Sequence, residues 1–184
     1  MSTFTTEDLE SRIQKLISKF MNEPKFFYSE SDMQCYLYHL LYENPVLQKD
    51  YFTKGGVKTS ILHNEYQTYG TYVKENKLLK KSERGRRGHF DLVILDPDSV
   101  SQERLWKSKI LFAIEMAFNN MDLTHFDNDL TKLTDSRNKV TNGYMLWFLS
   151  VKWPDSSIVE ERGNRLLAQH SNIKWIYEKK PRIV

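Results

Sequence analysis

Hydrophobic side chains recur at helical spacing in two segments near the start of the chain. Between residues 6 and 21 they return every three or four positions, and Thr5 stands just before this segment. A second segment follows Ser29, which forms a capping-box pattern with Asp32, and it ends before Asn44. The pattern therefore predicts two helices, at 6–21 and 29–44.

The middle of the chain changes to short stretches that are rich in aromatic and β-branched residues, as is typical of strands. Asp96, Pro97 and Asp98 end the second stretch, because proline cannot continue a central ladder. The third stretch follows soon after, so we expect it to pair with the second as a hairpin or meander. The three predicted strands are Ile61–Tyr72, His89–Leu95 and Lys109–Phe118.

Helical and strand patterns alternate in the C-terminal part. The predicted elements are a helix at 122–138, a strand at Tyr144–Val151, a helix that begins with Ser157 and Glu160, and a strand at Ile173–Tyr177. This order predicts an α/β fold with a central sheet of about four to five strands flanked by helices. We expect a single domain over residues 1–184, with an accessory helix at 6–21.

Composition narrows the class of protein. The 184 residues are 40% hydrophobic but contain no apolar run long enough to span a bilayer, and the first ten residues do not resemble a leader. A soluble, cytoplasmic protein without a membrane partner is therefore expected. Cys35 is the only cysteine, which excludes an intramolecular disulfide and a cysteine-rich zinc site, and we expect it to be at least half-buried.

Positive charge is concentrated in one segment, although the net charge of the chain is only +3. Between residues 74 and 87, two glutamates are outnumbered by basic residues, which could contact phosphates or simply face solvent as a charged loop. The basic residues are Lys74, Lys77, Lys80, Lys81, Arg84, Arg86 and Arg87.

Two acids interrupt otherwise apolar strands. Asp91 alternates with Phe90 and Leu92, and Glu115 stands between Ile114 and Met116. Burying an ionised carboxylate costs several kcal/mol unless a partner compensates its charge. A divalent cation such as Mg²⁺ or Mn²⁺ would supply that compensation and could activate a water. The alternatives are pairing with a local arginine, such as Arg86 or Arg87, or a solvated position at a strand end.

From the second helix onward, the order of elements and the two acids resemble the PD-(D/E)xK nuclease superfamily, whose fold is restriction-endonuclease-like. The resemblance assigns Asp91, in Gly-His-Phe-Asp-Leu-Val-Ile, and Glu115, in Ala-Ile-Glu-Met-Ala-Phe, as metal-binding carboxylates. Many members add an acid from the first helix or first strand, for which Glu30 and Glu65 are the candidates. Phe90 replaces the proline of the motif, a change that the superfamily tolerates.

Ala117 is the serious departure from that motif. The resemblance places a lysine at this position, where it positions or activates the attacking water and stabilises charge on the phosphate, and alanine can do neither. Three explanations compete: a natural non-catalytic protein, a lysine supplied from elsewhere, with Lys132 as the best candidate, or a deliberate substitution of lysine. The third is slightly favoured.

Other chemistries have little support in the sequence. The five histidines lack the spacing of a zinc site, although His89 lies close enough to Asp91 to touch a substrate. Glycine pairs such as Gly55–Gly56 do not form a phosphate-binding loop, so nucleotide hydrolysis is not predicted.

The resemblance therefore implies a magnesium-dependent endonuclease that hydrolyses DNA phosphodiester bonds, with impaired cleavage in a chain that carries Ala117. The first alternative is a non-catalytic nucleic-acid-binding or assembly module, and the second is a protein-interaction domain. Two-fold symmetric cleavage of duplex DNA would require a homodimer, and the helix at 6–21 is a candidate for the dimer contact or for an accessory contact with DNA.

Overall fold

The computed structural model describes residues 3–150 and 157–180. These residues form five α-helices, eight strands and three short 3-10 helices. The helices are α1 (Thr6–Asn22), α2 (Glu30–Tyr42), α3 (Pro97–Gln102), α4 (Leu123–Thr134) and α5 (Ser157–Gln169). The strands are β1 (Tyr51–Phe52), β2 (Lys58–Thr59), β3 (Leu62–Glu75), β4 (Leu78–Lys81), β5 (Arg86–Leu95), β6 (Ile110–Phe118), β7 (Val140–Leu149) and β8 (Ile173–Lys179).

A mixed sheet of six strands forms the centre of the molecule, in the order β4-β3-β5-β6-β7-β8. The β4 to β6 half is antiparallel, whereas β6, β7 and β8 run parallel. Each parallel connection crosses over through a helix, α4 before β7 and α5 before β8, as parallel pairing requires.

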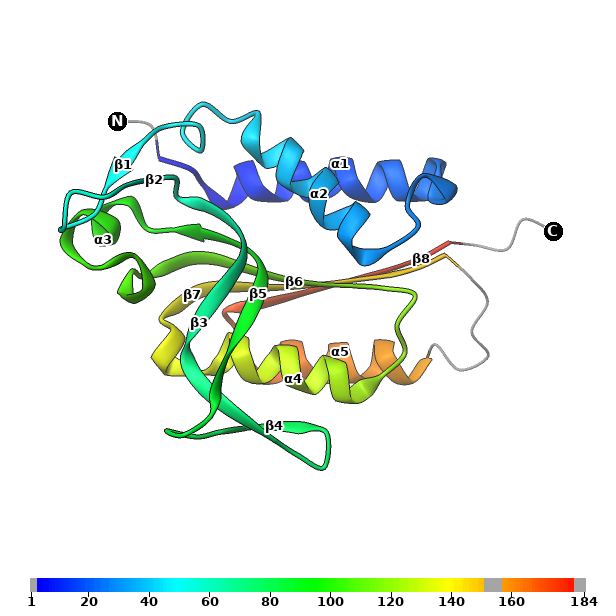
Figure 1. The fold of residues 1–184 in the computed structure, drawn as a ribbon. Coiled ribbons are helices and arrows are strands. Elements are labelled where there is room, and N and C mark those ends of the chain that lie inside the picture. The colour runs from blue at the N-terminus through cyan, green and yellow to red at the C-terminus, as the bar shows by residue number, and fades with distance from the viewer. Residues whose placement is uncertain (1–2, 151–156, 181–184) are drawn as a thin grey trace.

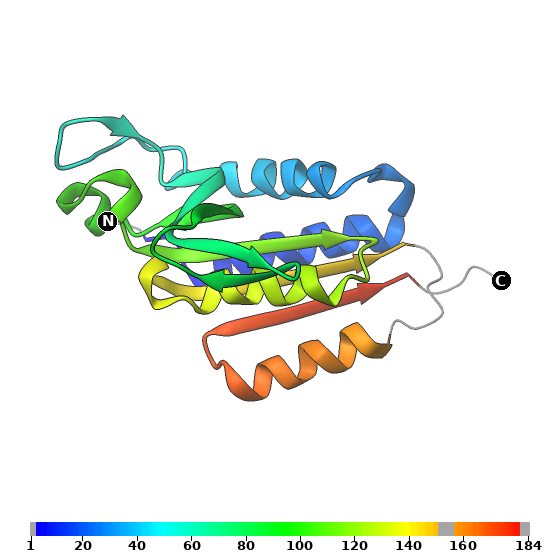
Figure 2. The ribbon, with the colours of Figure 1, turned by 60° about the horizontal axis from the view of Figure 1, so that its bottom comes forward.

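Helices cover both faces of the sheet: α1 and α2 lie on one side, and α4 and α5 on the other (Figure 1). Phe20 of α1 packs edge-on against Phe148, with ring centroids 5.1 Å apart. The preceding residue, Trp147, points to the opposite face and packs against Phe126 of α4 at 5.6 Å. Seen from below, α5 runs alongside the edge strand β8 (Figure 2).

Most predicted elements are confirmed. Both N-terminal helices are present with complete capping boxes, from Thr5 to Asp8 and from Ser29 to Asp32. The second and third predicted strands form an antiparallel pair. The predicted strand at Tyr144–Val151 begins earlier, at Val140, and its last residue lies outside the described residues.

The predicted number of strands, four to five, is wrong because β4 adds a sixth to the sheet. Two of its four residues are lysines within the basic segment, which suggested a loop, but β4 is an edge strand paired only with β3, so its lysines can face solvent. Asn76 and Lys77, both with positive φ, make the tight turn that joins the two strands.

Two smaller expectations are tested by burial and hydropathy. The prediction that Cys35 is at least half-buried is wrong, because it lies on the exposed side of α2. No helix in residues 3–150 or 157–180 has the length and apolar character needed to cross a bilayer.

Candidate active site

Asp91 and Glu115 lie on adjacent strands and on the sheet face that α4 covers. The pairing of β5 with β6 runs from Leu95 back to Leu92, which is opposite Ile114. Beyond that pair, the Met116 N–H donates to a side chain of β5 and not to its backbone. The acceptor is Asp91 Oδ2, at 2.6 Å. The two strands therefore hold the carboxyl groups at the point where their ladder ends.

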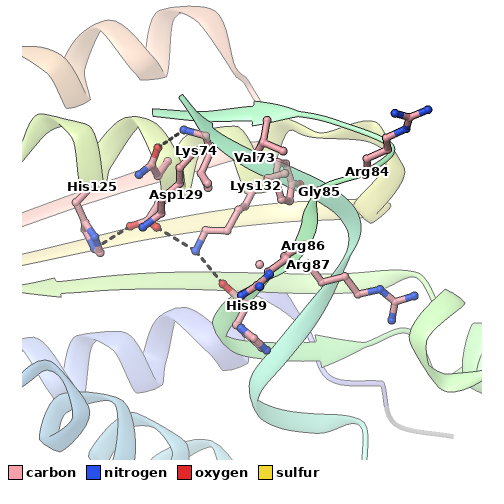
Figure 3. A pocket seen from close by; sticks show the side chains of 14 residues that line it. Val73, Lys74, Arg84, Gly85, Arg86, Arg87, His89, His125, Asp129 and Lys132 are labelled. Atoms are coloured by element: carbon pink, nitrogen blue, oxygen red, sulfur yellow. Dashed lines mark hydrogen bonds and ion pairs between the residues drawn. The ribbon is translucent and has the colours of Figure 1, made fainter. Parts of the chain in front are cut away.

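Lys132 of α4 reaches the buried Glu115. Its Nζ lies 2.5 Å from Glu115 Oε1 and 3.0 Å from Asp129 Oδ1, and it donates to the His89 carbonyl at 2.8 Å. Glu115 is 1% exposed and Asp129 is 3% exposed, so one ammonium group is shared between two buried carboxylates. Figure 3 shows Lys132 and Asp129 directed from α4 toward the strand that carries His89.

Burial and mutual charge shift the ionisation of this cluster. Burial raises the pKa of Asp91 to about 7, against the opposing hydrogen bond from Met116. Burial also raises the pKa of Glu115, which the charge of Lys132 only partly offsets. For Lys132, burial lowers the pKa, but Glu115 and Asp129 outweigh burial and raise it above the usual range. The two carboxylates therefore favour the charged form of Lys132.

Glu30 and Glu65, the two further acid candidates, both approach the cluster. Burial raises the pKa of Glu30, and the charges of His125 and Asp129 act on it next. Glu65 accepts a hydrogen bond from Gln34 Nε2 at 3.3 Å, and the same amide donates to the Asp91 carbonyl at 2.7 Å.

Glu65 also has an unusual backbone. Its φ is +49°, and it occupies the position between the pairs that join Asn64 to Leu92 and Tyr66 to Phe90. Positive φ in a residue other than glycine is uncommon and is frequent at functional sites. The irregularity places Glu65 opposite Asp91 in the register.

Ala117 is buried beside Trp147, its partner on β7, and both face α4. The cation of the cluster thus comes from Lys132 of α4 and contacts Glu115. The motif would instead place a lysine on the strand itself, at position 117. The alternative that a local arginine compensates either acid finds no support, since neither Asp91 nor Glu115 pairs with an arginine in the part of the chain that the structure describes.

A cavity of about 660 Å³ adjoins this cluster, between α4 and the strands β3, β4 and β5. Lys132, Asp129 and His125 line its α4 wall. Four members of the predicted basic set line it as well, namely Lys74, Arg84, Arg86 and Arg87.

The other three members of that set lie apart from the cavity lining. Lys80 pairs with Glu75, Lys81 lies 3.7 Å from Asp135, and Lys77 stands in the hairpin turn. The structure therefore divides the basic segment into cavity-lining residues and residues of the outer hairpin.

Two histidines border the cavity. His125 Nε2 lies 3.2 Å from Asp129 Oδ2, and its ring packs against Trp147. His89 lines the cavity too, and its carbonyl accepts the Lys132 bond. A chain of contacts thus leads from His125 at the cavity through Asp129 and Lys132 to Glu115.

The carboxylates of the cluster would offer oxygen donors to a metal. Within the described residues, no three histidine, cysteine or acidic side chains are placed so that they could share one ion. Mg²⁺ often binds proteins through one or two carboxylates and completes its shell with water and substrate phosphates. Asp91 and Glu115 are carboxylates of that kind, and one oxygen of Glu115 is already in contact with Lys132 Nζ.

Asp129, Gln34 and His125 were not predicted as site residues. Asp129 carried a usable signal, because it lies three residues after Phe126 and four before Leu133, on the apolar stripe of its helix. An acid on a buried helix face requires a partner. Gln34 had no comparable signal, since its role depends on the approach of α2 to the sheet.

Comparison with known proteins gives no match: the chain resembles no family profile, no curated protein and no solved structure closely enough to be assigned.

Proposed function

We propose that this chain is a metal-dependent nuclease of the PD-(D/E)xK type that acts on DNA, with a restriction-endonuclease-like core and with Lys132 as its site lysine. The observation that supports this most directly is the 2.5 Å contact between Lys132 Nζ and Glu115 Oε1, on the sheet face that also carries Asp91. On this proposal, Ala117 is a natural residue, because the cation is delivered by α4.

In the proposed reaction, water adds to the phosphorus of a phosphodiester, one P–O bond breaks, and a proton ends on the departing oxygen. Asp91 and Glu115 would hold Mg²⁺ or Mn²⁺, which when bound neutralises phosphate charge and lowers the pKa of a water. Lys132 is held as a cation by Glu115 and Asp129, so it would stabilise negative charge on the phosphate and would not accept a proton.

The cavity supports nucleic acid as the substrate. Lys74, Arg84, Arg86 and Arg87 surround it, and Lys132 belongs to both the cavity and the acid cluster. Phosphate contacts by these side chains would fix the position of the strand, and its scissile phosphate would then meet the carboxylates.

The experiment compares nicking of supercoiled plasmid in Mg²⁺ or Mn²⁺ by the unaltered chain, Lys132→Met and Ala117→Lys. We expect the unaltered chain to nick DNA and Lys132→Met to lose at least about 100-fold in rate. Asp91→Asn and Glu115→Gln should lose as much, whereas Lys49→Met, a change of an exposed lysine after α2, should not. Thermal melting of each variant separates loss of chemistry from loss of folding.

Ala117→Lys distinguishes the alternatives. If only this variant nicks DNA, position 117 is the natural site of the lysine and our assignment of Lys132 is wrong. If neither the unaltered chain nor Ala117→Lys nicks any form of DNA, the nuclease proposal fails.

A non-catalytic nucleic-acid-binding module is the second candidate. It is favoured by one observation: the Lys132 ammonium group already occupies one oxygen of Glu115 and one of Asp129. Calorimetric titration with Mn²⁺ tests it, since heat of binding that disappears in Asp91→Asn supports the nuclease, and absence of binding in both supports the module.

A further inference from the structure

The cavity beside Lys132 has walls that are fastened to each other. Asn128 of α4 accepts the Leu79 N–H at 2.8 Å and donates to the Lys77 carbonyl at 3.3 Å. The β3–β4 hairpin is therefore tied to α4, and the pocket has a wall on either side. A double helix is wider and stiffer than a single strand, so a single strand would enter between these walls more readily.

The charge around this pocket lacks protein counter-ions. Within residues 3–150 and 157–180, none of Lys74, Arg84, Arg86 and Arg87 forms an ion pair. The one acid in the lining, Asp129, is already engaged by Lys132 and His125. Like charges gathered in this way repel one another, so an anionic ligand would be stabilised here.

The dimensions and side chains suit a flexible strand. The volume of about 660 Å³ falls within the range of roughly 300–1,000 Å³ that is usual for pockets of small ligands. A cavity of this size could hold about one or two nucleotides. His89 and His125 offer ring faces, and arginine guanidinium planes can stack on bases that have left a helix. Arg84 and Arg87 extend away from Lys132, where they could meet the flanking phosphates (Figure 3).

We propose that the pocket between α4 and the β3–β4 hairpin binds a single-stranded segment of DNA, so that the protein acts on strand ends and unpaired regions in preference to continuous duplex. This inference rests on the proposed nuclease function, and it specifies the substrate class of the same site.

Binding without cleavage tests the inference separately from the chemistry. In EDTA, fluorescence anisotropy would compare a labelled single strand of about 12 nucleotides with a blunt duplex of the same length. We expect the single strand to bind at least about tenfold more tightly. Arg86→Ala and Lys74→Ala should each weaken binding of the single strand. Each should also reduce the steepness of log association constant against log salt concentration by about 1. Lys15→Ala, on α1, serves as the charge-matched control.

Asn128→Ala tests the role of the tie between the walls. This change should loosen the hairpin and leave the four basic side chains of the pocket in place. We therefore expect the protein to prefer single strands less, so that the ratio of duplex affinity to single-strand affinity rises toward one. Equal or tighter binding of duplex by the unaltered chain would overturn the inference, as would binding that does not depend on salt. If the unaltered chain prefers single strands but nicks no DNA, the nuclease proposal is contradicted and the proposal of a single-strand pocket is still supported.

Discussion

Asp135, which follows α4, organises a buried polar network away from the acid cluster. Its carboxylate accepts bonds from the Arg137 guanidinium, at 2.6 Å for the shortest, and from the Tyr72 hydroxyl at 2.9 Å. The Tyr72 hydroxyl in turn accepts from Asn138 at 2.8 Å. We expect Asp135→Asn to lower the free energy of unfolding by about 1–3 kcal/mol, because one carboxylate oxygen is replaced by an NH2 group that cannot accept the bonds aimed at it. Urea denaturation measures the change.

The same residue gives a pH dependence. Burial alone would raise the pKa of Asp135, but the Arg137 hydrogen bonds, the Tyr72 hydrogen bond and the charge of Lys81 together outweigh burial and lower it. A carboxyl whose pKa is lower in the folded state stabilises the fold above its unfolded pKa, near 3.9, and loses that contribution as pH falls through the folded value. The stability difference between the unaltered chain and Asp135→Asn should therefore shrink below about pH 4. A difference that stays constant down to pH 3 would contradict this.

At the scale of single residues, alternation along two strands was enough to single out Asp91 and Glu115. An acid that interrupts an apolar strand requires compensation, and this requirement is visible in sequence. The pairing of Glu115 with Lys132 could not be predicted with the same force, because it depends on how α4 docks on the sheet. Lys132 could only be named as a candidate.

Helix α5 illustrates how packing can override helix propensity. Gly163 lies inside α5, where replacing glycine with alanine ordinarily stabilises a helix by about 1 kcal/mol. A Cβ at this position would meet the Trp175 ring at 2.1 Å, and that ring is held by Phe126 and Trp147. Because overpacking commonly costs about 1–3 kcal/mol, we expect Gly163→Ala to destabilise the protein or leave it no more stable.

The neighbouring Asn164 provides the matched control for this prediction. It is exposed on the same helix, so Asn164→Ala changes propensity without a clash and should raise the melting temperature slightly. If Gly163→Ala stabilised the protein as much as Asn164→Ala did, α5 would not pack against Trp175 as described.

At the scale of elements, hydrophobic period predicted the long helices and central strands correctly, because their buried faces leave a regular pattern. The edge strand β4 and the β1–β2 pair left none, since they are short and their side chains meet solvent. For the same reason, the basic segment read as a loop, although it contains β4 and the beginning of β5.

At the scale of the whole molecule, distant parts of the chain are joined across the sheet. Glu10 of α1 accepts hydrogen bonds from the Tyr144 hydroxyl at 3.1 Å and from Lys174 at 2.7 Å, which link the first helix to β7 and β8. Helix α1 also packs against the body of the protein, and its buried residues include Leu9, Ile13 and Phe20. Sequence pattern could predict the helix, but not its partner.

The change from antiparallel to parallel pairing at β6 has a consequence for the order of folding. Strands β3 to β6 pair through connections that are local in sequence, whereas β7 and β8 must each wait for a crossover helix to close a longer loop. We expect Val93→Ala, in β5, chiefly to slow folding and Ile173→Ala, in β8, chiefly to speed unfolding. Stopped-flow chevron analysis would reveal the difference, and the reverse assignment of rates would mean that the parallel half nucleates the fold.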